Sequence, residues 1–308
     1  MLRKPCHARA GAKGSTGSSS DALGRSEWYS FLDEVNRAAD GLIKASGAGR
    51  DVWFRGHTCK SYPLLPTLLR GYFDLGSERT RAHIHRQEHR LYREFAARIR
   101  EFHGLVNEDW DNLFAMQHCG APTRLLEWSE SLAIGIYFAL HRFDGSPGVP
   151  SPPDPQDPPC VWILNPYALN ARFDGAASVR TVVDPKELGT EGQRGSNGRY
   201  RDVLRGPNVS WQEPVAVHPL HRTTRMQLHR SWFTIHGDLH VGLDEVEGHD
   251  SFLARVDLPH AAESAAREYL RDCGLDLLSL YRDLPHIGAH LNRCNVSEKL
   301  QFMKATAV

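Results

Sequence analysis

Two arginines stand inside apolar, aromatic segments, where a positive charge is costly to bury without a partner. Arg55 lies in WFRGH and Arg124 lies in QHCGAPTRLLEW. In a strand, the side chain of Arg55 points inward with every second residue, and Gly56 permits a tight turn or a close backbone approach. Arg55 therefore either clamps an anion at the end of a strand or pairs with a buried acid such as Glu127.

The segment around Arg124 is unusually dense in polar side chains for a protein core. A helix that opens at Ser129 would offer free N–H groups to an anion, and Arg124 beside it would add two-pronged recognition of phosphate or carboxylate. The alternative is a buried Arg124–Glu127 pair that orders the turn. The polar and indole groups of this segment are Gln117, His118, Thr123, Arg124, Glu127, Trp128 and Ser129.

A possible zinc motif occurs in HRQEH, where His85 and His89 have the spacing of the H-x-x-E-H pattern. The chain has 17 histidines, so this spacing arises readily by chance, and no third ligand stands out. We expect a solvated helix face here and no metal site.

A further candidate is His236 in SWFTIHG, a segment that reads as a strand. Trp232 and Thr234 share its face, and the histidine is either a proton carrier or a residue satisfied at the strand end. The sequence has no Ser–His–Asp order, no P-loop and no GxGxxG motif.

Composition limits the class of protein. The 308 residues carry 37 basic and 37 acidic side chains, which argues against a general electrostatic grip on nucleic acid or membrane while leaving a local patch possible. Six scattered cysteines and the absence of an apolar run near 18 residues favour a soluble protein of the reducing cytoplasm.

The elements that must position these residues alternate between helices and short strands. Helical spacing is expected from Ser26, over 82–104 and 108–118, after Ser129, in ESAAREYLRDCG and in LPHIGAHLNRC. Strands are expected in DVWFRG, LLEW, CVWILNP, PVAVHP, SWFTIHG and SFLARVDLP. This order predicts an α+β fold, a single domain with a small mixed or mostly antiparallel sheet flanked by helices.

The domain is expected to span 26–297. Residues 1–25 are rich in Gly, Ser, Ala and Lys and predict a disordered tail. Residues 145–159 form a proline-rich loop, and 185–210 read as a mobile loop.

Taken together, the motifs resemble those of the FRG domain, a family of bacteria and phages. The resemblance rests on FRGH after an apolar strand, a helix with E-x-x-L-x-x-E-F, QHCGAPTRLLEW before a helix ending YFA, and RM…FTIHG. It covers roughly 27–240 and places Glu88 where the family has an acid. Two positions depart from the family pattern: Glu127 replaces a common Asp, and His229-Arg230-Ser231 replaces Gln-Gln-Gly before the last strand.

The family is similar to NAD-dependent ADP-ribosyltransferases, which use a strand Arg or His, a Ser/Thr-opened strand–helix step and a late acid. This likeness implies a cytoplasmic transferase in phage defence or a toxin system, with NAD as substrate and a nucleic acid or protein as acceptor. The alternative is a non-catalytic binding module in which Arg55 and Arg124 are buried structural ions. The implied catalytic residues are Glu127, Glu213 and His236, and the ligand-binding residues are Arg55, Gly56, His57, Gln117, His118, Thr123, Arg124, Ser129 and Tyr137.

Overall fold

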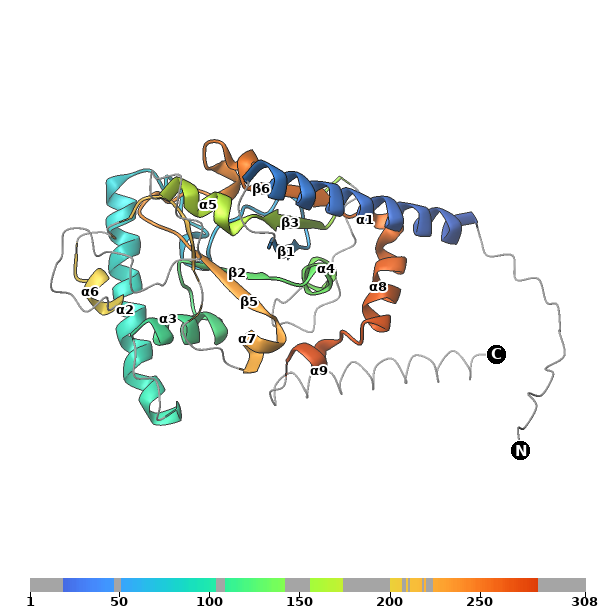
Figure 1. Ribbon diagram of the computed structural model, residues 1–308. Coiled ribbons are helices and arrows are strands. Elements are labelled where there is room, and N and C mark those ends of the chain that lie inside the picture. Colours follow the sequence, from blue (N-terminus) through green and yellow to red (C-terminus); the bar gives the residue numbers. More distant parts are fainter. Residues whose placement is uncertain are drawn as a thin grey trace, which may run out of the picture.

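A six-stranded antiparallel sheet forms the centre of the computed structural model (Figure 1). Its strand order is β4-β5-β2-β1-β3-β6, so the expectation of an α+β fold with a mostly antiparallel sheet is confirmed. The strands are β1 (Trp53–His57), β2 (Leu125–Ser129), β3 (Cys160–Leu164), β4 (Val215–Val217), β5 (Ser231–Ile235) and β6 (Leu253–Asp257). The residues that the structure describes are 19–46, 51–103, 109–141, 156–173, 200–206, 209, 211–217, 219 and 224–281.

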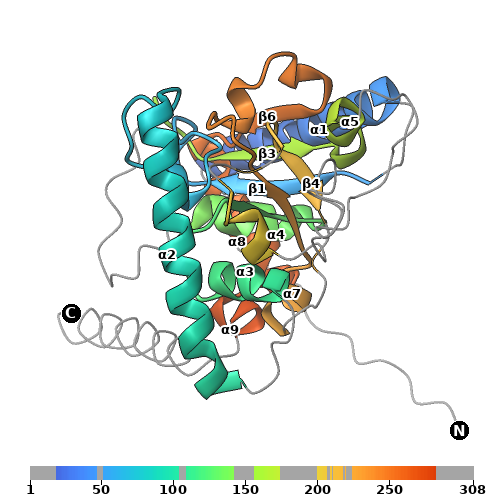
Figure 2. The same ribbon diagram turned by 90° about the vertical axis from the view of Figure 1, so that its left-hand side faces the viewer.

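The helices flank this sheet, and α2 stands along one side of the molecule (Figures 1 and 2). The α-helices are α1 (Ser19–Ser46), α2 (Glu78–His103), α3 (Asp109–His118), α4 (Leu132–Leu140), α5 (Pro166–Phe173), α6 (Tyr200–Val203), α7 (Thr224–Leu228), α8 (Glu263–Asp272) and α9 (Leu277–Leu280). Single 3-10 turns are η1 (Thr67–Leu69), η3 (Leu243–Glu245), η4 (His249–Ser251) and η5 (His260–Ala262). None of the helices in the described ranges has the length and apolar character needed to cross a membrane.

Both faces of the sheet are covered, because side chains alternate along each strand and both sets are largely apolar. On one face, α1, α4 and α8 pack over the β1, β3 and β6 half, and α2, α3 and α6 pack over the β2, β5 and β4 half. On the other face, Trp53, Trp128 and Trp162 pack with residues of α5 and the 3-10 turns. Arg55 shares this tryptophan face by alternation.

Some boundaries differ from those expected. α1 begins at Ser19 and not at Ser26, so residues 19–25 are helical. Ser129 ends β2, and the cap of α4 is Ser131. Residues 1–18, most of the proline-rich loop, most of 185–210 and the helix expected in LPHIGAHLNRC lie outside the described residues.

Gly56 lets α4 approach β1 closely. A β-carbon built at Gly56 would overlap the carbonyl oxygen of Gly135 and the amide nitrogen of Ala139, which are backbone atoms that cannot rotate away. The close backbone approach expected from the sequence is therefore between two elements of the fold.

We expect Gly56→Ala to lower the free energy of unfolding by about 3 kcal/mol, because overpacking here must shift backbone. Urea unfolding measures the change. Gly41→Ala is the matched control: Gly41 lies exposed in α1 with no neighbouring atom to meet a β-carbon, and alanine should stabilise that helix by about 1 kcal/mol. Equal unfolding midpoints for wild type and Gly56→Ala would contradict the close approach.

Candidate functional site

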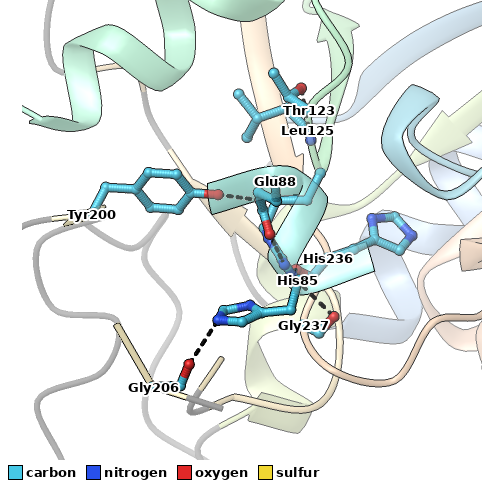
Figure 3. A network of polar contacts seen from close by, with 9 residues as sticks. His85, Glu88, Thr123, Leu125, Tyr200, Gly206, His236 and Gly237 are labelled. Atoms are coloured by element: carbon cyan, nitrogen blue, oxygen red, sulfur yellow. Dashed lines mark hydrogen bonds and ion pairs between the residues drawn. The ribbon is translucent and has the colours of Figure 1, made fainter. Parts of the chain in front are cut away.

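Arg124 is a buried structural ion held by Glu88 of α2. Its Nε donates to Glu88 Oε1 at 2.7 Å, and its Nη2 donates to Glu88 Oε2. Its Nη1 donates to the carbonyl oxygens of His236 and Gly237 at 2.8 and 3.2 Å. Figure 3 shows Tyr200, His236 and Gly237 around Glu88, and the Tyr200 hydroxyl donates to Glu88 Oε1. The side chains of Arg124 and Glu88 are 1% and 2% exposed, so this pair is sealed from solvent.

The electrostatics of the pair agree with a structural role. Burial opposes the charge of Arg124, but Glu88 more than offsets this and raises the pKa of Arg124 above its usual value. The same burial, together with Glu88, raises the pKa of the Tyr200 hydroxyl. The expectation of a buried Arg–Glu pair is confirmed for Arg124, but the partner is Glu88 and not Glu127.

His236 belongs to this buried network rather than to a proton-transfer site. Its side chain is fully buried after β5, and burial, followed by the charges of Arg124 and His240, lowers its pKa to about 3. A histidine with that pKa is neutral at pH 7. Arg124 contacts His236 through the backbone, since the His236 carbonyl oxygen accepts its hydrogen bond.

Arg55 has a different environment. Its Nη1 donates to the carbonyl oxygen of Glu127 at 2.7 Å, and its Nε donates to His57 Nε2 at 3.1 Å. His57 must therefore present a lone pair at Nε2 and carry its proton on Nδ1, which lies 3.1 Å from the Tyr62 carbonyl oxygen. Burial, followed by the charge of Arg55, lowers the pKa of His57 to about 3, so this neutral form persists at pH 7.

The guanidinium group of Arg55 keeps unused donors. It has five N–H groups, two of them donate to Glu127 and His57, and three are left without a partner among the described residues. No acid in the described part of the chain forms a salt bridge with it. Burial, followed by the charge of Arg70, lowers the pKa of Arg55 from its usual value to about 10, and Glu127 offsets this in part. Arg55 is thus a half-buried cation that forms no salt bridge within the described ranges.

The geometry of the sheet explains how Arg55 reaches Glu127. Strands β1 and β2 pair at one position, Phe54 with Ser129, whereas β1 pairs with β3 along all five of its residues. The Glu127 carbonyl oxygen, which lies beyond that bridge, accepts from the Arg55 side chain instead of from β1 backbone. Because β1 and β2 pair at only one position, the Glu127 carbonyl oxygen is left to accept the hydrogen bond that positions the Arg55 side chain.

Tryptophans surround Arg55 on its face of the sheet. Trp162 is the cross-strand partner of Arg55, and its buried indole N–H has no hydrogen-bond partner in the described ranges. Trp53, two residues from Arg55, stacks on the half-buried Trp232 with ring centroids 5.1 Å apart. Unused N–H donors and flat aromatic surfaces are features that suit a phosphate-bearing aromatic ligand.

The carboxylate of Glu127 lies on the other face of the sheet. Its Oε1 accepts from the hydroxyl of Ser231 at 2.5 Å and lies 3.2 Å from His229 Nδ1. Burial raises the pKa of Glu127, but the hydrogen bonds and charges of His229, Ser231 and Arg225 outweigh it and lower this pKa to about 2. Glu127 is therefore ionised at neutral pH.

The remaining predicted site residues fall into separate places. The Thr123 hydroxyl donates to Gln117 Oε1 at 2.5 Å and closes the turn before β2, and the Ser129 hydroxyl donates to the His229 carbonyl oxygen at 2.7 Å. Tyr137 is buried and stacks on His141.

The other two predicted residues have partners away from Arg55. The carbonyl oxygen of His118 accepts a hydrogen bond from Arg225. Glu213, which lies before the edge strand β4, pairs with Arg172 at 3.4 Å. The structure therefore brings together Arg55, His57 and the backbone carbonyl oxygen of Glu127, whereas the carboxylate of Glu127 lies on the opposite face of the sheet.

Several residues of the site were not predicted from sequence. Arg70 and Trp162 beside Arg55 have no local signature, because only strand pairing and loop packing place them there. His229 and Ser231 did have a signal, since they are the positions that depart from the FRG pattern, and both contact Glu127. His85 of the possible zinc motif is buried, and its Nε2 lies 2.9 Å from the Gly206 carbonyl oxygen.

Comparison with known families agrees with the sequence motifs. Residues 50–146 match the family model of the FRG domain, so the chain carries an FRG domain at those residues. This stretch contains β1, α2, α3, β2 and α4, and with them Arg55, Glu88, Arg124 and Glu127. No curated protein and no solved structure matches the chain.

Proposed function

We propose that the FRG domain of this protein binds a phosphate-bearing nucleotide at Arg55 and that NAD is that nucleotide. The observation that carries the proposal is the set of three unused N–H donors on a half-buried guanidinium group with no salt-bridge partner in the described residues. A phosphate would supply the missing charge and accept two parallel hydrogen bonds from Arg55. His57 holds the guanidinium group in place for this role.

The aromatic surroundings support a nucleotide over free phosphate. Trp232 is half-buried and stacks on Trp53, so part of its surface is open on the tryptophan face of the sheet. A base or nicotinamide ring binds well against such a surface. Arg70 adds a second cation close enough to lower the pKa of Arg55, and a diphosphate would relieve that repulsion.

The reaction we propose is transfer of ADP-ribose from NAD in the cytoplasm, as an effector of phage defence or a toxin. The bond between ribose C1′ and the nicotinamide nitrogen breaks, and nicotinamide leaves with the electron pair. A nucleophile of a protein or nucleic acid then bonds to C1′ and loses its proton. The carboxylate of Glu127 is ionised because its pKa is about 2, but it lies on the opposite face of the sheet from Arg55, so we assign it no contact with the ribose of NAD bound at Arg55.

A non-catalytic binding module is the second candidate. The observation that favours it is the Arg124–Glu88 pair, because one of the two arginines assigned to the ligand is a structural ion. Glu213 and His236 have partners away from Arg55, and the carboxylate of Glu127 lies on the opposite face of the sheet, so none of the three proposed catalytic groups lies beside Arg55.

Incubation of the full chain with NAD, followed by chromatography of the nicotinamide released, separates these candidates. The transferase predicts nicotinamide release by wild type, and Arg55→Gln, which loses the guanidinium group that binds the phosphates, should release nicotinamide at least about tenfold more slowly at NAD concentrations below saturation. A binding module predicts a calorimetric signal with NAD and no nicotinamide. If neither binding nor release occurs, the nucleotide proposal is wrong.

A further inference from the structure

The outer face of α2 carries a single row of basic side chains. Arg79, His83, Arg86, Arg90 and Arg93 are all exposed and are spaced at alternating intervals of four and three residues. This spacing places them on one side of a helix, opposite Glu88, Tyr92 and Ile99, which face the core. From the first to the last the row extends about 21 Å at 1.5 Å per residue. Figure 2 shows α2 along the near side of the molecule.

The charge of this row is not neutralised within the described structure. Arg79, Arg86 and Arg93 form no ion pair or hydrogen bond with the described part of the chain. Arg90 forms an ion pair with Glu94 at 3.9 Å, and Glu94 also forms an ion pair with Arg98 at 3.5 Å. Burial lowers the pKa of the neighbouring His89, and the positive charges of Arg93 and Arg205 add to the effect. The whole chain has zero formal net charge, so the row is a local feature.

The composition of the row distinguishes among polyanions. The four side chains of the row other than His83 are arginines, whose planar groups bind phosphate oxygens in pairs. No large apolar side chain of α2 is exposed among the described residues, whereas a helix that binds a membrane surface inserts an apolar face. The row has no aromatic side chain other than His83 on which unpaired bases could stack, and it lacks the apolar anchors of a protein interface. A straight row of arginines matches the regularly spaced phosphates of a duplex.

We propose that the outer face of α2 is a docking surface for the phosphate backbone of double-stranded nucleic acid. The contacts are to phosphates, so binding is independent of base sequence and strongly dependent on salt. This surface is separate from the Arg55 site and does not rest on the function proposed for it.

The test is fluorescence anisotropy of a labelled 20-base-pair DNA duplex titrated with the full chain at a series of salt concentrations. With four phosphate contacts, the logarithm of the association constant should fall linearly with the logarithm of the salt concentration. The expected slope is about −3.6, since each contact contributes about −0.9 to the slope. The double variant Arg86→Gln/Arg93→Gln should reduce the magnitude of that slope by about 2 and weaken binding at least about tenfold at low salt.

Arg98→Gln is the matched control, because Arg98 is an exposed arginine of the same helix that lies off the row and pairs with Glu94. It should keep the affinity and slope of the wild type to within about one contact. Thermal unfolding of all three proteins should agree, since the substituted side chains are exposed. No duplex binding by wild type at low salt, equal losses in the double variant and the control, or binding to single-stranded DNA or phosphatidylserine vesicles in preference to the duplex overturns the proposal.

Discussion

Arg124→Met is expected to lower the free energy of unfolding by about 3–5 kcal/mol, because it leaves the carboxylate of Glu88 buried without its partner. The carbonyl oxygens of His236 and Gly237 lose their donor at the same time. Glu88→Gln should lower the free energy of unfolding by a similar amount, since it leaves the guanidinium group of Arg124 buried without an opposite charge. Urea unfolding at pH 7, monitored by circular dichroism, measures both.

The matched control for Glu88 lies one and a half turns further along the same helix. Glu94 is 53% exposed and pairs with Arg90 and Arg98, so Glu94→Gln should change stability by less than about 1 kcal/mol. The double variant Arg124→Met/Glu88→Leu should be less destabilised than the sum of the single variants, because no charge is left unpaired. Additive losses, or an Arg124→Met protein as stable as wild type, would contradict the assignment of Arg124 as a structural ion.

Much of the fold was predictable because local pattern decides it. The runs CVWIL and SWFTI are β-branched and aromatic, and both form strands of the sheet. The stripe of Leu91, Phe95, Ile99 and Phe102 predicts α2 by its period. The start of α1 at Ser19 was missed because residues 19–25 are mostly small or polar, and the short helices α5, α7 and α9 have too few turns for a periodic signal.

The candidate site was only partly predictable because partners are chosen across the sheet. Arg55 and Arg124 were both recognised as unusual, but the sequence does not show that Glu88, 36 residues before Arg124, is the acid that meets it. One local signal did exist: residues three apart in an extended chain point to opposite faces, which separates Arg124 from Glu127. The role of Glu213 came from likeness to another family and from chain order, and that of His236 came from its place at the end of a predicted strand. Neither argument shows which residues lie beside Arg55.

Arg55 is expected to behave in the opposite way to Arg124, because the fold gains little from its charge. Burial and Arg70 lower its pKa to about 10, so its charged form is less favourable in the folded chain than in the unfolded one. Arg55→Gln therefore should leave the free energy of unfolding unchanged to within about 1 kcal/mol, the scale of its two neutral hydrogen bonds. Binding of a ligand phosphate to Arg55→Gln, by contrast, should be weaker than binding to wild type by about 2–5 kcal/mol, which is roughly a 30-fold or larger loss of affinity.

The most direct test of these two roles is calorimetric titration of NAD into wild type and Arg55→Gln, with thermal unfolding of each protein measured alongside. The result we expect is a binding isotherm for wild type, an affinity reduced about 30-fold or more for Arg55→Gln, and unfolding midpoints that agree to within a few degrees. Equal affinity in the two proteins, or a loss of stability in Arg55→Gln as large as that in Arg124→Met, would contradict the assignment of Arg55 to a ligand site.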